Sequence, residues 1–159
     1  MARDYMLRLI DHVALMLAEI MAKRKRGQRA EARTEIAAQA LQHTGLPLEL
    51  IRGAAPPMVA ELLRQGGELR FIRAVVLAEL LIQDAEISEE SGDAMTAFSG
   101  YMHAWHLLRD AAQSFSRDEH AHFGARQEHA RLRMIALAPG LQIDLAKLMP
   151  AGFFPAAHG

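Results

Sequence analysis

The fold is decided by residues 68–114, which read ELRFIRAVVLAELLIQDAEISEESGDAMTAFSGYMHAWHLLRDAAQS. Apolar side chains recur at helical spacing in the first half and predict a long central helix over 68–91; they are Leu69, Ile72, Val76, Leu80 and Ile87. Gly92 ends this helix, and Asp93 is a suitable N-cap for a next helix that reaches about Ser114. The stretch therefore predicts a helical hairpin.

The rest of the chain follows the same pattern. We expect further helices over 3–26, 28–43, 48–52, 58–65, 116–137 and 143–149. Gly27 separates the first two helices, while Ser116 and Glu119 form a capping box for the helix that begins there. Because no stretch has the alternation of a strand, the protein is predicted to be all α. We expect one domain, 1–159, with a first hairpin (1–44), a connector (45–67), a second hairpin (68–115) and a C-terminal helix with a tail (116–159).

The two hairpins share a weak repeat. A glycine turn is followed by small and larger residues at fixed spacing, at Gly92, Ala97, Tyr101 and Ala104 in one hairpin and at Gly27, Ala32 and Ile36 in the other. This spacing resembles the second helix of a tetratricopeptide repeat, where the alanine lets two antiparallel helices touch. The match predicts tetratricopeptide-like hairpins with right-handed antiparallel packing, made of about five main helices plus a short helical connector.

A second resemblance rests on the order of motifs along residues 3–108. The matching positions are Arg3-Asp4-Tyr5, Arg8, Ile10, Gly27, Glu31-Ala32, Gly45-Leu46, Leu62-Leu63, Gly67, Leu77-Ala78, Leu80-Leu81, Glu86-Ile87 and Gly92. In these residues the chain resembles an uncharacterised bacterial all-helical family, a domain of unknown function with tetratricopeptide-like hairpins. Most of these positions are apolar or turn residues, so the resemblance implies a fold and assigns no catalytic residue.

Charged residues collect beside the two glycine turns. The first turn is basic, with Lys23, Arg24, Lys25, Arg26 and Arg29, and the second is acidic, with Asp84, Glu86, Glu89, Glu90 and Asp93. Stacked hairpins would place both turns at one edge. We therefore expect the two runs to face each other, within the chain or across a dimer, unless both are solvated clusters.

The composition excludes several classes of protein. The chain has 159 residues, a net charge of −1 and no cysteine, which rules out disulfides, cysteine-based zinc sites and a thiol nucleophile. The balanced charge provides no general attraction to nucleic acid. No apolar run approaches a membrane span and no signal-peptide pattern is present, so we expect a cytoplasmic protein without membrane contact.

Histidines in 103–129 are the candidate metal ligands. His103 and His106 share a helix face with Asp110, and His122 and His129 lie together on one face of the next helix. Two such faces across a hairpin could bind zinc, nickel or iron. Histidines on the helix surface explain the same pattern, and no established metal motif is present, so we expect no cofactor.

Aromatic residues are the candidate partner-binding residues. Tyr101 and Trp105 form either a groove for a peptide or part of the core, and Phe153 and Phe154 in the tail dock either on the chain itself or on another subunit.

No catalytic motif is recognisable, so we expect a non-enzymatic interaction or scaffold module that binds a protein partner or itself. A homodimer through the apolar face of the first or third long helix is one form of this. The alternative is a helical metal-binding or sensor protein that uses the 103–129 histidines. Binding of nucleic acid through the basic run at 23–33 is a third possibility.

Overall fold

The computed structural model describes residues 9–65, 67 and 70–155, and in this part of the chain all regular structure is helical. The helices are α2 (Leu9–Lys25), α3 (Arg29–Thr44), α4 (Leu48–Gly53), α5 (Pro56–Arg64), α6 (Arg70–Glu90), α7 (Ala94–Ala111), the 3-10 helix η2 (Ala112–Ser114), α8 (Arg117–Leu141) and α9 (Leu145–Leu148). The all-α prediction is confirmed for these residues. The predicted helix starts at 3 and 68 lie outside them.

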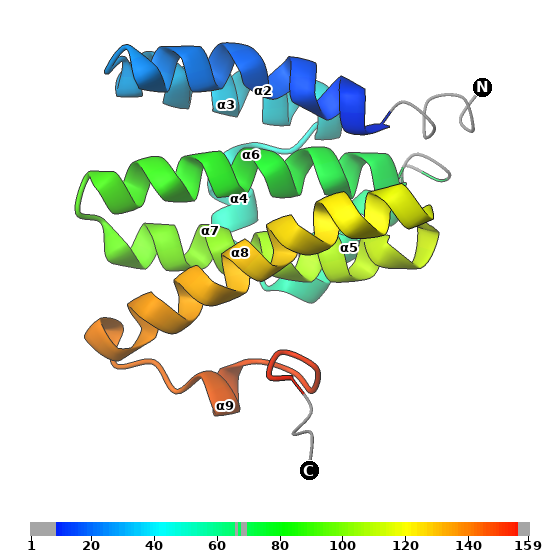
Figure 1. The fold of residues 1–159 in the computed structure, drawn as a ribbon, viewed down its shortest axis with the longest axis vertical. Helices are drawn as coiled ribbons and strands as arrows, with labels where there is room; N and C mark the ends of the chain where they lie inside the picture. Colours follow the sequence, from blue (N-terminus) through cyan, green and yellow to red (C-terminus); the bar gives the residue numbers. More distant parts are fainter. Residues whose placement is uncertain (1–8, 66, 68–69, 156–159) are drawn as a thin grey trace.

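The helices form successive layers (Figure 1). α2 and α3 are one layer, α6 and α7 are the next, and α8 crosses α7 diagonally, while the short α4 and α5 pack on α7. α6 lies in the middle, and every residue from Ala74 to Ala85 is buried. The idea of a dimer through the apolar face of this third long helix is therefore wrong, because the chain's own helices cover it. Within the described ranges, no helix has the length and apolar character needed to cross a membrane.

The predicted caps are present. The side chain of Asp93 accepts a hydrogen bond from the backbone N–H of Thr96 at the start of α7. At the start of α8, Ser116 and Glu119 exchange the two hydrogen bonds of a capping box, 2.8 and 3.3 Å long. The turn between α6 and α7 is made by Gly92, whose φ of +82° favours glycine. Local sequence therefore determines where these helices begin and end.

Proline is involved at two of the helix boundaries that differ from the prediction. α5 begins at Pro56 instead of Met58, because the first turn of a helix needs no backbone N–H donors. α8 continues beyond Leu137 through Pro139 to Leu141 and ends at a left-handed Gln142. A proline near the helix end removes only one hydrogen bond, and the partly exposed last turn can leave the freed carbonyl in water.

The predicted contact between the basic and acidic turns is confirmed within the chain. Arg24 at the end of α2 binds Glu86 at 3.0 Å and Glu90 at 2.9 Å, both on α6. Arg29 at the start of α3 binds Glu90 at 3.3 Å. These ion pairs connect the α2–α3 layer to the end of α6.

Arginines from several other elements also reach α6. Asp84 is almost fully buried; it binds Arg52 of α4 and lies 3.9 Å from Arg33 of α3. From α8, Arg126 binds Glu79 at 3.1 Å. Arg133, also of α8, binds Glu89. The Arg52–Asp84 pair holds the short helix α4, and with it α5, against the α6–α7 hairpin.

Two helical glycines allow a matched test of this packing. A Cβ atom added at Gly100 of α7 would lie 3.0 Å from the Cβ of Ala85 and 3.2 Å from the backbone oxygen of Leu81, whereas a Cβ at Gly124 of α8 would meet nothing within 4 Å. We expect Gly100→Ala to lower the free energy of unfolding by about 1–3 kcal/mol, because α7 must move away from α6. Gly124→Ala should raise it by about 0.5–1 kcal/mol through helix propensity alone.

Urea denaturation of the two glycine variants measures both effects. If Gly100→Ala stabilises the protein as much as Gly124→Ala does, the close approach of α6 and α7 is wrong.

Candidate functional site

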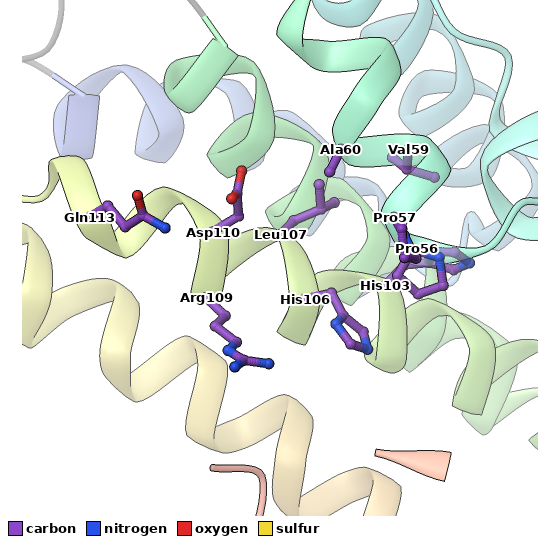
Figure 2. A pocket seen from close by; sticks show the side chains of 10 residues that line it. All are labelled: Pro56, Pro57, Val59, Ala60, His103, His106, Leu107, Arg109, Asp110 and Gln113. Carbon is purple, nitrogen blue, oxygen red and sulfur yellow. The ribbon is translucent and has the colours of Figure 1, made fainter. Parts of the chain in front are cut away.

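A pocket of about 350 Å³ lies between the start of α5 and the exposed side of α7 (Figure 2). Along one face of α7 the pocket is lined by His103, His106 and Asp110, and Gln113 of η2 continues this stripe, with the spacing of three and four residues that is typical of one helix face. The other lining residues are Pro56, Pro57, Val59, Ala60, Leu107 and Arg109. The pocket therefore has a polar floor from α7 and an apolar wall from α5.

The wall is rigid for reasons visible in the sequence. Pro56 and Pro57 occupy the first turn of α5 with fixed backbone angles, and Val59 anchors that turn in the core at 1% exposure. The preceding helix α4 is held by the ion pair from Arg52 to Asp84. The wall is thus fixed to the same hairpin that carries the floor.

His103 closes the inner end of the pocket and is 1% exposed. Neither of its ring nitrogens makes a hydrogen bond of normal geometry to the described residues. Burial lowers the pKa of His103, and the backbone of Arg52 opposes this only in part. The imidazole is therefore neutral at pH 7: its donor faces the backbone of Arg52 outside normal hydrogen-bond geometry, and its acceptor has no partner among the described residues.

His106 lies one turn further along the floor. Burial lowers the pKa of this residue to about 4, with smaller contributions from the neighbouring His103 and Arg109. Its ring packs edge-on against Trp105, with centroids 5.1 Å apart. Both imidazoles of the floor are therefore uncharged at neutral pH.

The remaining charges of the lining lie on opposite sides of α7. Figure 2 shows the carboxylate of Asp110 and the guanidinium of Arg109 pointing away from each other. The guanidinium carbon of Arg109 lies 5.5 Å from the centre of the Trp105 ring. The half-buried Asp110 has no hydrogen bond or ion pair with the rest of the described chain. Its carboxylate is free to bind a ligand.

The predicted metal ligands do not form one group. His103, His106 and Asp110 line the pocket, but His129 lies elsewhere, 3.3 Å from Glu86 and edge-on to Tyr101. His122 is exposed and packs against the ring of Phe123. Across the described residues, no set of three or more His, Cys, Asp or Glu side chains is placed to hold a metal ion.

The predicted partner-binding aromatics are mostly in the core. Tyr101 is 1% exposed, Trp105 4% and Phe153 0%, so none of these three presents a surface to a partner. The tail docks on its own chain, where Phe153 packs edge-on against Trp105 with centroids 5.3 Å apart. Phe154 remains exposed at 47%. Of the two alternatives for Tyr101 and Trp105, the structure therefore shows the one in which they are part of the core.

Sequence reasoning missed the wall of the pocket and Gln113. The available signal was the continuation of the His103–His106–Asp110 stripe by one further turn to Gln113, together with the Pro56–Pro57 start of a short helix. Nothing in the sequence indicates that these two segments lie together.

Burial of neutral imidazoles makes stability depend on pH. Because the folded pKa of His106 lies below its unfolded value of about 6.5, the unfolded state binds the extra proton, and stability falls as pH falls through this interval. Between pH 7 and 5 we expect the protein to lose about 1–2 kcal/mol more than the His106→Gln variant, which cannot titrate there. Urea denaturation at both pH values measures the difference, and equal losses would show that His106 is exposed to water.

Comparisons with known proteins give no match: no family model, no curated protein and no solved structure is similar to this chain.

Proposed function

We propose that this protein is a non-enzymatic binding module, in which a helical scaffold presents the pocket between α5 and α7 to a partner. The observation that carries the proposal is His103, whose imidazole is buried in the pocket lining, faces the backbone of Arg52 and makes no hydrogen bond of normal geometry with either ring nitrogen. A buried polar group without a hydrogen bond costs about 1–3 kcal/mol. An occupant of the pocket that bonds to this ring would remove that cost.

We further propose that the scaffold is a pair of tetratricopeptide-like hairpins, α2–α3 and α6–α7, followed by α8 as a capping helix. Left-handed glycines form both turns, Gly27 with φ of +75° and Gly92 with φ of +82°. α3 packs against α6, as the second helix of one repeat packs against the first helix of the next.

The chemistry of the lining favours binding over catalysis. A catalytic imidazole is oriented by a third group and reaches a nucleophile by a hydrogen bond. In the described part of the chain, neither His103 nor His106 has a hydrogen bond to a carboxylate or hydroxyl group. Neutral hydrogen-bonding groups beside an apolar wall are instead typical of recognition sites.

A peptide selection tests this function. Random peptides displayed on phage are selected on the full chain and then measured against two matched variants, Ala60→Arg in the pocket wall and Ala125→Arg on the exposed face of α8. We expect the enriched peptides to bind the Ala125→Arg variant as they bind the parent, and the Ala60→Arg variant at least about tenfold more weakly. Equal binding to the Ala60→Arg variant, or no enrichment, would contradict the proposal.

A further inference from the structure

The charges around the pocket indicate the chemistry of its occupant. This inference rests on the proposed binding function. We infer that the pocket takes a primary ammonium or guanidinium group on an unbranched apolar stem, as in a lysine or arginine side chain, with Asp110 as its counter-ion. The carboxylate of Asp110, the orientation of Arg109 away from it, the neutral histidines and the apolar wall together favour this occupant.

The charge on the side of α7 that faces α5 is negative. Asp110 is half-buried in the lining and forms no ion pair with the described residues, although every strongly buried carboxylate of α6 has an arginine. The guanidinium of Arg109 is directed to the opposite side of α7, toward the ring of Trp105. A cation entering the pocket therefore meets an unpaired carboxylate, while an anion would meet that same carboxylate as a repulsive charge.

The histidines of the floor do not oppose a cation. His103 and His106 are both uncharged at neutral pH, because burial opposes their protonation. Two imidazolium groups would repel an ammonium ion, whereas two neutral imidazoles can accept a hydrogen bond from it or from the peptide group next to it. The floor thus offers acceptors without adding positive charge.

The apolar wall suits an unbranched stem. Leu107 and the α5 residues Pro57, Val59 and Ala60 form an apolar surface beside the polar floor. His103 and Asp110 lie about 10 Å apart along the axis of α7, at 1.5 Å of rise per residue. Lysine and arginine carry their charge at the end of a methylene chain that packs on such surfaces. A branched or short cation would leave the wall uncovered.

Nuclear magnetic resonance titration of the full chain tests the inference with defined probes. They are N-acetyl-lysine-N-methylamide, its Nε-acetylated form, which keeps the stem and loses the charge, and 1,5-diaminopentane as a free amine. We expect the charged probes to bind with a dissociation constant of about 1 mM or lower and to shift the amide signals of 103–113. The acetylated probe should bind at least tenfold more weakly.

Matched variants locate the charge that is recognised. Asp110→Asn should weaken binding of the lysine probe at least tenfold, and Asp118→Asn, on the exposed first turn of α8, should leave it within twofold. Binding of the diamine alone would identify a free amine as the occupant, and stronger binding of the lysine amide would identify a protein segment; both support the inference.

Three outcomes overturn the inference: no binding of either charged probe, equal binding of the acetylated probe, or no effect of Asp110→Asn. The proposed binding function is tested separately. It holds, and only the inference about the cation fails, if the selected peptides lack lysine and arginine and still bind the Ala60→Arg variant more weakly than the parent. If the selection fails too, both proposals are wrong.

Discussion

Replacing Arg126 with methionine is expected to lower the free energy of unfolding by about 3–5 kcal/mol. Arg126 of α8 donates hydrogen bonds of 3.2 and 3.1 Å from its Nε to the two carboxylate oxygens of Glu79, a residue of α6 that is 1% exposed. Burial raises the pKa of Glu79, and Arg126 is the main group opposing that shift. Without the arginine, a buried carboxylate has to be neutralised or left uncompensated.

Two further variants separate this cost from the loss of packing. The double variant Glu79→Leu/Arg126→Met should recover most of the lost stability, since replacing a buried ion pair by apolar side chains is often neutral. Arg131→Met on the same helix breaks a pair, 2.7 Å long, with Glu128, whose carboxylate is 51% exposed where that of Glu79 is 2% exposed, and should cost less than about 1 kcal/mol. Urea denaturation measures all three. If the Arg126 and Arg131 variants lose equal stability, the Arg126–Glu79 pair is not buried.

Truncation of Phe153 is expected to have an effect of similar size. Phe153 is fully buried against Trp105, so Phe153→Ala should cost about 3–5 kcal/mol and release the tail from α7. Phe154→Ala, at a ring that is 47% exposed, should cost less than about 1 kcal/mol. The chain has one tryptophan, so the fluorescence of Trp105 reports on the docked tail directly.

The expected readout is a shift of the Trp105 emission toward longer wavelength in the folded Phe153→Ala variant, together with the loss of stability. An unchanged spectrum and unchanged stability would mean that the tail is not docked on the chain. Trp105 and Phe153 would then again be candidates for an aromatic surface that binds a partner.

Sequence reasoning succeeded where the cause is local. Asp93, Ser116 and Glu119 are caps because their side chains reach backbone donors within three residues, so neighbouring sequence contains the whole interaction. The charged contact between the turns was also predictable, because the glycine turns fix which ends of the helices lie together. Arg24 then meets Glu86 and Glu90, although these lie far along the chain.

Reasoning from sequence failed to predict which longer helix the short helices α4 and α5 pack against. The α5–α7 pocket exists because α4 and α5 lie beside α7, where Ile51 and Val59 are buried in the core and Arg52 binds Asp84, and no periodicity encodes that placement. The burial of the individual histidines could not be predicted from the sequence either. His103 and His122 both lie on amphipathic helices, yet one is buried in a pocket lining and the other is exposed, since burial depends on the partner helix.

The free energy of unfolding of the His103→Leu variant tests the central claim, that the pocket holds a polar group kept for a ligand. Because the buried imidazole makes no hydrogen bond of normal geometry and meets the backbone of Arg52 only in a weaker contact, the apolar replacement should raise stability by about 1–2 kcal/mol. His122→Leu, at an exposed position of α8, is the control and should change stability by less than about 0.5 kcal/mol. A loss of more than about 1 kcal/mol in the His103 variant would contradict the account, because it would show that the imidazole is bonded within the fold.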